Sequence, residues 1–125
     1  MTGNKGEWSE LYVFLRLLSE GRIYAADECV KKIADVFYPV LKVIREEQKG
    51  QPIEYIIADQ NVWVEKEDTR LITVPRSELE EKASYLFEQI SNHTNSFEIE
   101  EIAEYMNGIK VNKIKAPSTD TTIGT

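Results

Sequence analysis

The residue types in this sequence that could do chemistry are mainly carboxylates, lysines and one histidine. Carboxylate oxygens bind a hard divalent cation such as Mg²⁺, and that ion can activate water and stabilise a phosphoryl transition state. The segments Glu47–Lys49 and Glu80–Lys82 both match the E-x-K pattern of metal-dependent nucleases. This pattern is frequent by chance, and the second segment lies in a predicted helix whereas the nuclease motif needs a strand. We therefore interpret both segments as solvated charge.

Nucleophilic catalysis and nucleotide binding find little support in the remaining residues. His93 is the only histidine, so a Ser-His-Asp triad or a multi-histidine metal site is hard to assemble, and we predict a surface role in a polar loop. Cys29 is the only cysteine and has no obvious base near it in the sequence, so we predict a small, at least half-buried side chain. The glycine-rich phosphate-binding motifs are absent, which argues against nucleotide hydrolysis.

A helix is predicted near the N-terminus, in the segment EWSELYVFLRLLSEG. Its apolar residues recur with helical spacing and form a wide buried face. Glu7 and Glu10 fall in the first turn, where exposed N–H groups favour carboxylates, and Gly21 is placed to end the helix. The face comprises Trp8, Leu11, Tyr12, Val13, Phe14, Leu15, Leu17 and Leu18.

The middle of the sequence predicts a mainly antiparallel sheet. The segment VFYPVLKVIREE is rich in β-branched and aromatic residues, and Pro39 within it favours an edge or bulged strand over a helix. Three further strand-like runs are separated by short turns, as in a meander: IEYIIAD, NVWVEKE and RLITVP. Before them, RIYAA is short and apolar, and DECVKKIADV is interpreted as a polar helical turn or a loop.

Two more helices are predicted after the sheet. Ser77 and Glu80 have the spacing of a capping box at the start of RSELEEKASYLFEQI, and FEIEEIAEYMNG reads as a shorter amphipathic helix. IKVNKIKA then predicts a strand with alternating lysines. We expect one α+β domain over residues 1–115, with an N-terminal helix, a central mainly antiparallel sheet and two C-terminal helices, followed by a disordered tail over 116–125.

The charge distribution bears on possible partners. The 125 residues carry a net charge of −7, and residues 61–105 hold 11 acidic but only 4 basic side chains. Residues 106–125 hold 3 basic and 1 acidic side chains. Proteins that bind nucleic acid tightly usually present a basic surface, so this composition argues against autonomous tight DNA binding. The absence of a secretory leader and of a long apolar run favours a cytoplasmic protein.

Four segments carry a resemblance to a known family. They are GNKGEWSELYVFLRLLSEGRIYAADE, FYPVLKVIREE, SFEIEEIAEYMN and KIKAPSTD, and in this order they resemble the N-terminal region of the HpaII-like type II restriction endonucleases. The resemblance runs from Gly3 to Asp120. It implies a bacterial enzyme that cuts duplex DNA at a short palindrome, CCGG for the founding member, with Mg²⁺ and a PD-(D/E)xK-type core. Palindromic sites further imply a two-fold arrangement, such as a homodimer.

The sequence departs from this family at its end. In the family, KAPSTD leads into a strand with a metal-binding Asp, followed by a strand with the catalytic Lys and most of the base-reading surface. Here the sequence continues only with TTIGT. We therefore expect a truncated enzyme that is inactive as an isolated chain.

The resemblance also implies roles for particular residues. In many nucleases of this superfamily a glutamate of the first helix reaches the metal, which suggests Glu10, or else Glu7, as a catalytic and metal-binding residue. The alternative is that both carboxylates only complement the helix N-terminus, worth about 0.3–1 kcal/mol each. The candidates for contacts to the DNA backbone, with ordinary solvated surface as the alternative reading, are Lys5, Lys110, Lys113 and Lys115.

Two functional hypotheses from different classes follow. The first is the N-terminal region of a restriction endonuclease, as the resemblance implies. The second is a small acidic α+β domain that binds a protein partner or dimerises, because the chain has a net charge of −7 and shows no complete catalytic constellation. A third reading, an acidic hydrolase with paired carboxylates, has no support from residue spacing.

Overall fold

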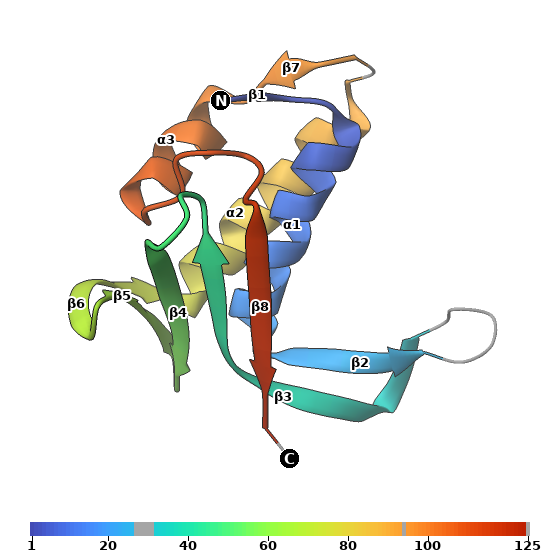
Figure 1. Cartoon of the computed structure of the whole chain (residues 1–125). Helices are drawn as coiled ribbons and strands as arrows, with labels where there is room; N and C mark the ends of the chain where they lie inside the picture. The colour runs from blue at the N-terminus through green and yellow to red at the C-terminus, as the bar shows by residue number, and fades with distance from the viewer. Residues whose placement is uncertain (27–31, 94, 125) are drawn as a thin grey trace.

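The computed structural model describes residues 1–26, 32–93 and 95–124. Within them the helices are α1 (Lys5–Glu20), α2 (Arg76–Ser91) and α3 (Glu100–Gly108). The strands are β1 (Thr2–Gly3), β2 (Arg22–Ala26), β3 (Lys32–Glu46), β4 (Pro52–Ala58), β5 (Asn61–Lys66), β6 (Thr69–Pro75), β7 (Phe97–Glu98) and β8 (Ser118–Ile123). The prediction of an α+β fold with a mainly antiparallel sheet is confirmed (Figure 1).

The main sheet has the strand order β2-β3-β4-β5-β6, and β8 pairs with β3 along the edge opposite β4. All of these pairings are antiparallel. The predicted meander corresponds to β4, β5 and β6. Its second turn, at Glu67 and Asp68, has positive φ at both residues, as a tight hairpin turn requires. Of the two alternatives predicted for the segment around Pro39, the bulge is present, since the register of β3 with β8 shifts between Val40 and Lys42. The edge alternative is wrong, because β3 pairs with β2, β4 and β8.

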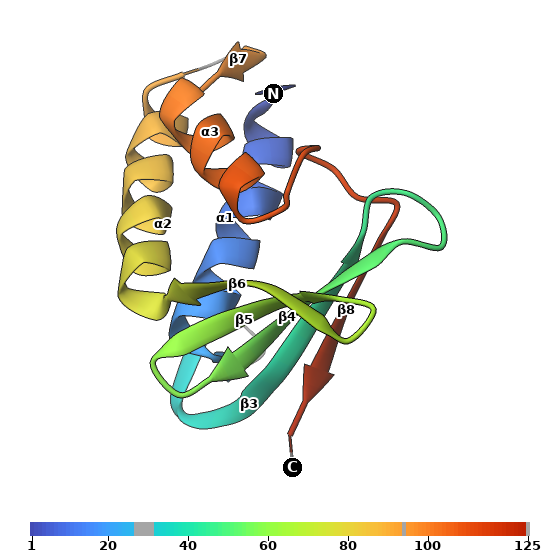
Figure 2. The same ribbon diagram turned by 90° about the vertical axis from the view of Figure 1, so that its left-hand side faces the viewer.

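Helices α1 and α2 pack against each other and cover one face of the sheet, and α3 lies beside them (Figure 2). The core forms where these layers meet. The fully buried residues of α1 are Trp8, Leu11, Leu15 and Leu18, with Phe14 nearly so, and they agree with the predicted face. Val13, which was predicted to widen that face, is 53% exposed. The sheet contributes Val40, Val43, Tyr55, Val62, Val64 and Val74, and the other helices contribute Leu79, Ala83, Leu86, Ile102 and Met106.

Both ends of α1 are capped. The Asn4 side chain accepts a hydrogen bond from the Glu7 N–H at 2.9 Å, and the Glu7 carboxylate accepts one from the Asn4 N–H at 3.1 Å, which together form a capping box. Gly21 ends the helix in the left-handed region, as predicted, with φ of 68°. A Cβ there would lie 2.8 Å from the end of the Arg76 side chain, which could shift, so it is the left-handed backbone conformation that favours glycine.

The C-terminal segment differs from the prediction in two ways. Residues 118–123 were expected in a disordered tail but form β8, whose threonines suit a strand and whose backbone pairs with one edge of β3. Residues 109–116 were expected as a strand but form a turn and an irregular loop. Tertiary pairing decides both cases, because β8 occupies the edge of β3 that is free of β4.

The start of α2 and the first residues of β3 also differ from the prediction. Ser77 does not cap α2, because the helix already begins at Arg76, after Pro75, and has no side-chain cap. Of the segment interpreted as a helical turn or loop, residues 27–31, including Cys29, lie outside the described residues, whereas residues 32–36 belong to β3. In the described part of the chain, no helix has the length and apolar character needed to cross a bilayer.

Candidate nucleic-acid interface

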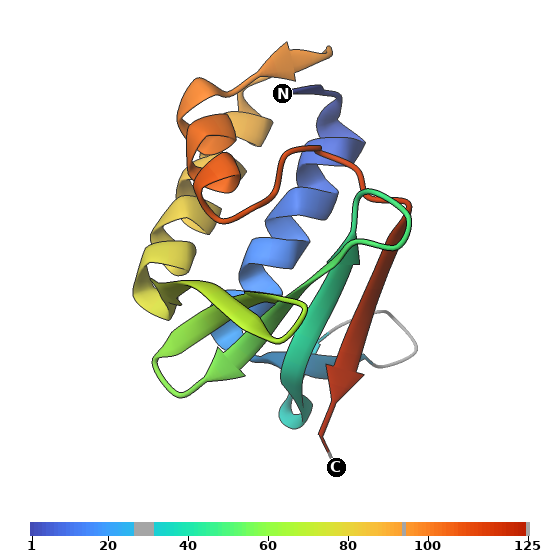
Figure 3. The same ribbon diagram turned by 60° about the vertical axis from the view of Figure 1, so that its left-hand side comes forward.

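A cleft of about 420 Å³ opens between the β3–β4 turn, the end of β5 and the loop that follows α3. Figure 3 shows this turn and this loop at the same end of the molecule. The charged and amide side chains that line the cleft include Arg45, Glu47, Gln51, Lys66, Lys110 and Lys113. Its charged groups are therefore four cations and one carboxylate, a net charge of +3 in a chain whose net charge is −7.

The loop over residues 109–115, here called the basic loop, is fixed to the sheet at its start by Tyr55. The Tyr55 hydroxyl donates a hydrogen bond of 2.8 Å to the Ile109 carbonyl. Tyr55 is fully buried, and its ring meets Phe14 edge-on at 5.0 Å. Burial raises the pKa of Tyr55 well above its ordinary value; nearby Arg45 lowers that pKa and Glu47 raises it. The hydroxyl is therefore a neutral donor at physiological pH.

Arg45 and Glu47 fix the middle of the basic loop. The backbone N–H of Asn112 donates to both Glu47 carboxylate oxygens, at 3.2 and 3.0 Å. The Arg45 guanidinium donates to the Lys113 carbonyl, and its Nε lies 3.4 Å from Glu47. Arg45 is only 5% exposed, so its charge is compensated within the protein by Glu47 and the carbonyl. Side chains of β3, β4 and the β3–β4 turn thus hold the loop at Ile109, Asn112 and Lys113.

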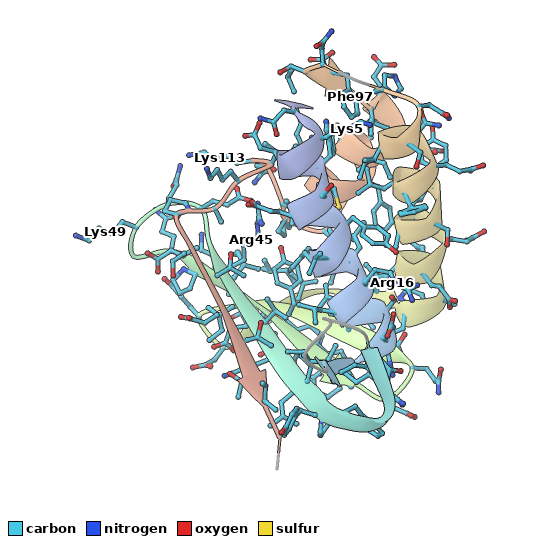
Figure 4. All side chains as sticks on the ribbon, turned by 90° about the vertical axis from the view of Figure 1, so that its right-hand side faces the viewer. Lys5, Arg16, Arg45, Lys49, Phe97 and Lys113 are labelled. Carbon is cyan, nitrogen blue, oxygen red and sulfur yellow. The ribbon has the colours of Figure 1, made fainter. Side chains whose placement is uncertain are left out.

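The basic loop also reaches the start of α1. The end of the Ile114 side chain packs so closely on Gly3 that a Cβ there would have to displace it. Figure 4 shows Lys113 on the loop that runs beside the first turns of α1, with Lys5 at the beginning of that helix. The cationic residues predicted at the two ends of the sequence therefore lie in one region of the molecule.

The structure brings some of the predicted site residues together and not others. Lys110 and Lys113 line the cleft, and Lys115 lies exposed further along the same loop. Lys5 is exposed at the first position of α1. Glu7 is engaged in the capping box, and Glu10 is exposed one turn further on, away from the cleft lining.

Sequence reasoning missed Arg45 and Lys66 as members of this site. A signal for Arg45 was present, because strand alternation places it on the same face as buried Val43, and a buried arginine requires a partner. Lys66 gives no such signal. It ends β5, where a solvated lysine is ordinary, and only the fold brings it to the cleft.

The other candidate chemical groups have structural roles. The Nδ1–H of His93 donates a 2.7 Å hydrogen bond to the Gln89 carbonyl, and the ring stacks on Phe97 with centroids 4.4 Å apart, so His93 is less solvated than predicted. Glu47, of the first E-x-K segment, binds the loop backbone, and the second segment lies in α2. Among the described residues, no group of three or more His, Cys, Asp or Glu side chains could hold a metal ion.

The fold and cleft define an α+β domain with a basic loop held against an otherwise acidic molecule. The family model of the HpaII restriction endonuclease matches residues 4–123. The chain is also 33% identical over 122 residues to the type II restriction enzyme HpaII of Haemophilus parainfluenzae; the match covers 94% of this chain and 33% of that enzyme. No solved structure matches the chain. The chain belongs to the HpaII restriction endonuclease family, and it spans about a third of the length of this relative.

Proposed function

We propose that this chain forms part of a type II restriction endonuclease that cleaves duplex DNA at a short palindrome, with CCGG as the first expected target. The observation that carries this proposal is the family match over residues 4–123. The cationic cleft supports it, because a net charge of +3 gathered in one place suits a polyanionic substrate. In this proposal Lys5, Lys110, Lys113 and Lys115 contact the DNA backbone.

The proposed cleavage uses Mg²⁺, which would activate water and stabilise the charge on the scissile phosphate. The described residues do not provide a complete metal site, so the proposal includes inactivity of this chain alone. Glu10 is the proposed contribution of α1 to the metal site, with Glu7 second because its carboxylate is already hydrogen-bonded in the capping box. A homodimer, which would match the symmetry of a palindrome, is part of the same proposal.

The test is a chimera in which this chain replaces the matching segment of the Haemophilus parainfluenzae enzyme. We expect the chimera to cut plasmid DNA at CCGG with Mg²⁺, and the 125-residue chain alone to leave the plasmid intact. A chimera that unfolds cooperatively, as a folded protein does, but does not cut would contradict the proposed function. Cutting by the isolated chain would contradict only the proposed inactivity.

A second candidate is an acidic interaction or dimerisation domain without nuclease activity. The observation in its favour is that three large apolar side chains of β3 are exposed, namely Phe37, Tyr38 and Leu41, at 43%, 51% and 51%. Size-exclusion chromatography with light scattering separates the two candidates when it is combined with a duplex-binding assay. A stable dimer that ignores DNA would favour the second candidate.

A further inference from the structure

The three lysines of the cleft have no carboxylate partner among the described residues, unlike several cations elsewhere in the molecule. Lys42 pairs with Glu54 at 3.5 Å, Lys82 with Glu101 at 3.8 Å, and Arg16 with Glu20. Within residues 1–26, 32–93 and 95–124, no carboxylate pairs with the three lysines of the cleft, Lys66, Lys110 and Lys113. Because acidic residues outnumber basic ones in this chain, three unpaired ammonium groups around one cleft leave a local positive potential without compensation.

Lys110 also has an unusual backbone conformation. Helix α3 ends in a Schellman motif, in which the Val111 N–H donates to the Met106 carbonyl at 2.8 Å and the Lys110 N–H donates to the Asn107 carbonyl at 3.1 Å. The motif requires a left-handed backbone conformation at the residue before Val111. That residue is Lys110, and its φ is 71°. Glycine is the usual residue here, because a Cβ strains the left-handed conformation.

This strain is not needed to form the cap. Val111 and Met106 are both fully buried and supply the apolar contact that accompanies the motif, whereas the Lys110 side chain is exposed and lines the cleft. Glycine at this position would keep the hydrogen bonds of the motif. A strained residue whose side chain adds nothing to the fold points to a function for that side chain.

Lys66 lines the same cleft from a different element of the fold. It ends β5 and lies 3.4 Å from the Gln51 side chain, which belongs to the β3–β4 turn. Lys110 and Lys113 come from the basic loop, which Tyr55, Glu47 and Arg45 hold in place. The two walls thus present ammonium groups from segments more than forty residues apart in the sequence, across a cleft of about 420 Å³.

We propose that this cleft is a binding site for a backbone phosphate of duplex DNA, in which Lys66 faces Lys110 and Lys113, and that the left-handed cap serves to place the Lys110 ammonium. This inference rests on the proposed function for its choice of DNA as the source of phosphate. It adds Lys66 to the residues predicted to contact DNA. It also accounts for the backbone strain at Lys110, which a solvated lysine without a function does not explain.

The test measures both stability and DNA binding of the 125-residue chain, using fluorescence anisotropy with a labelled duplex at several salt concentrations. We expect Lys110→Gly to raise Tm by about 3–6 °C through relief of strain. The same substitution should weaken binding about tenfold near ~50 mM salt and reduce the slope of log K against log salt by about 0.9. Lys66→Gln should weaken binding to a similar extent without raising Tm.

Lys82→Gln is the matched control, because it removes the same charge from a lysine that pairs with Glu101 outside the cleft. Control binding should stay close to that of the wild type. The proposal is overturned if Lys110→Gly or Lys66→Gln binds DNA no worse than this control, or if the wild-type chain does not bind duplex DNA at low salt. Tighter binding of inorganic phosphate than of the duplex, at matched ionic strength, would overturn the assignment to the DNA backbone. The chimera that tests the proposed function does not depend on these binding results, so each can fail alone.

Discussion

The start of α1 and the basic loop both carry charged residues predicted to act on DNA, but they differ in how local structure accounts for those residues. At the start of α1, Glu7 is explained by the capping box, and the backbone is regular. In the basic loop, Lys110 is in a left-handed conformation, and the loop is held by side chains of the sheet. The helix start is stable by its own hydrogen bonds, whereas the loop depends on tertiary contacts.

This difference shows which charged residues carry information about function. A carboxylate in the first turn of a helix is favoured by the helix itself, so its presence needs no substrate. Lys110 occupies the left-handed cap position where glycine is usual, and no carboxylate pairs with it among the described residues. Local structure therefore does not explain the presence of a lysine there. The four predictions that follow test this contrast, starting with the largest effect.

Loss of the Arg45 guanidinium should have the largest effect on the loop. Arg45→Met leaves the carboxylate of Glu47, whose side chain is 13% exposed, without its cationic partner, so we expect a loss of about 3 kcal/mol in the free energy of unfolding. Urea denaturation measures this change. Arg70→Met is the control, because Arg70 is exposed and its pair with Glu65 spans 3.9 Å, and it should cost less than about 1 kcal/mol. Equal costs for the two arginines would contradict the role of Arg45 as an anchor.

Removal of the Tyr55 hydroxyl should have a smaller effect. Tyr55→Phe removes the donor to the Ile109 carbonyl, so we expect a cost of about 1–2 kcal/mol at neutral pH. Because the folded pKa of Tyr55 is raised, the unfolded chain ionises from about pH 10 while the folded protein does not, and the stability contributed by this residue is lost above that pH. Urea denaturation at pH 7 and near pH 10.5 should show that the difference in free energy of unfolding between the wild type and Tyr55→Phe becomes smaller at the higher pH. A larger difference at the higher pH would contradict the role of the Tyr55 hydroxyl as a buried neutral donor.

Loss of the α1 cap should cost about 1 kcal/mol. Asn4→Ala removes the acceptor for the Glu7 N–H and breaks the capping box. Thermal unfolding of this variant can be compared with that of Ser9→Ala, an exposed position of the same helix that should stay within about 0.5 kcal/mol of the wild type. Equal losses of stability for Asn4→Ala and Ser9→Ala would show that the capping box does not stabilise the start of α1. The start of the helix would then depend on tertiary contacts, as the basic loop does.

Substitution of Glu10 should have the smallest effect on stability. Glu10 is exposed and the capping box does not use it, so Glu10→Ala should change the free energy of unfolding by less than about 0.5 kcal/mol. In the chimera, the same change should lower the rate of DNA cleavage if Glu10 reaches the metal. Unchanged cleavage would remove Glu10 from the proposed metal site and leave the helix terminus as its only role.

The sequence predicted elements whose pattern is local. The apolar period of α1, Gly21 at its end and the turns between β4, β5 and β6 are all visible within short windows. It failed for β8 and the basic loop, because the identity of a strand there depends on which segment pairs with β3. Lys110 and Lys113 were predicted as a basic group, but Arg45 and Lys66 join them only through long-range folding.

The pairing of β1 with β7 has a consequence for the order in which the molecule can fold. Thr2 lies opposite Glu98, and its hydroxyl donates a 2.8 Å hydrogen bond to that carboxylate, so residues 96 positions apart in the sequence must meet. Trp8 likewise donates to the Phe97 carbonyl. During synthesis, the first turn of α1 therefore emerges long before its partners, and contacts at such separation close slowly. Until residue 97 has been synthesised, the Trp8 indole N–H lacks the Phe97 carbonyl to which it donates in the folded protein.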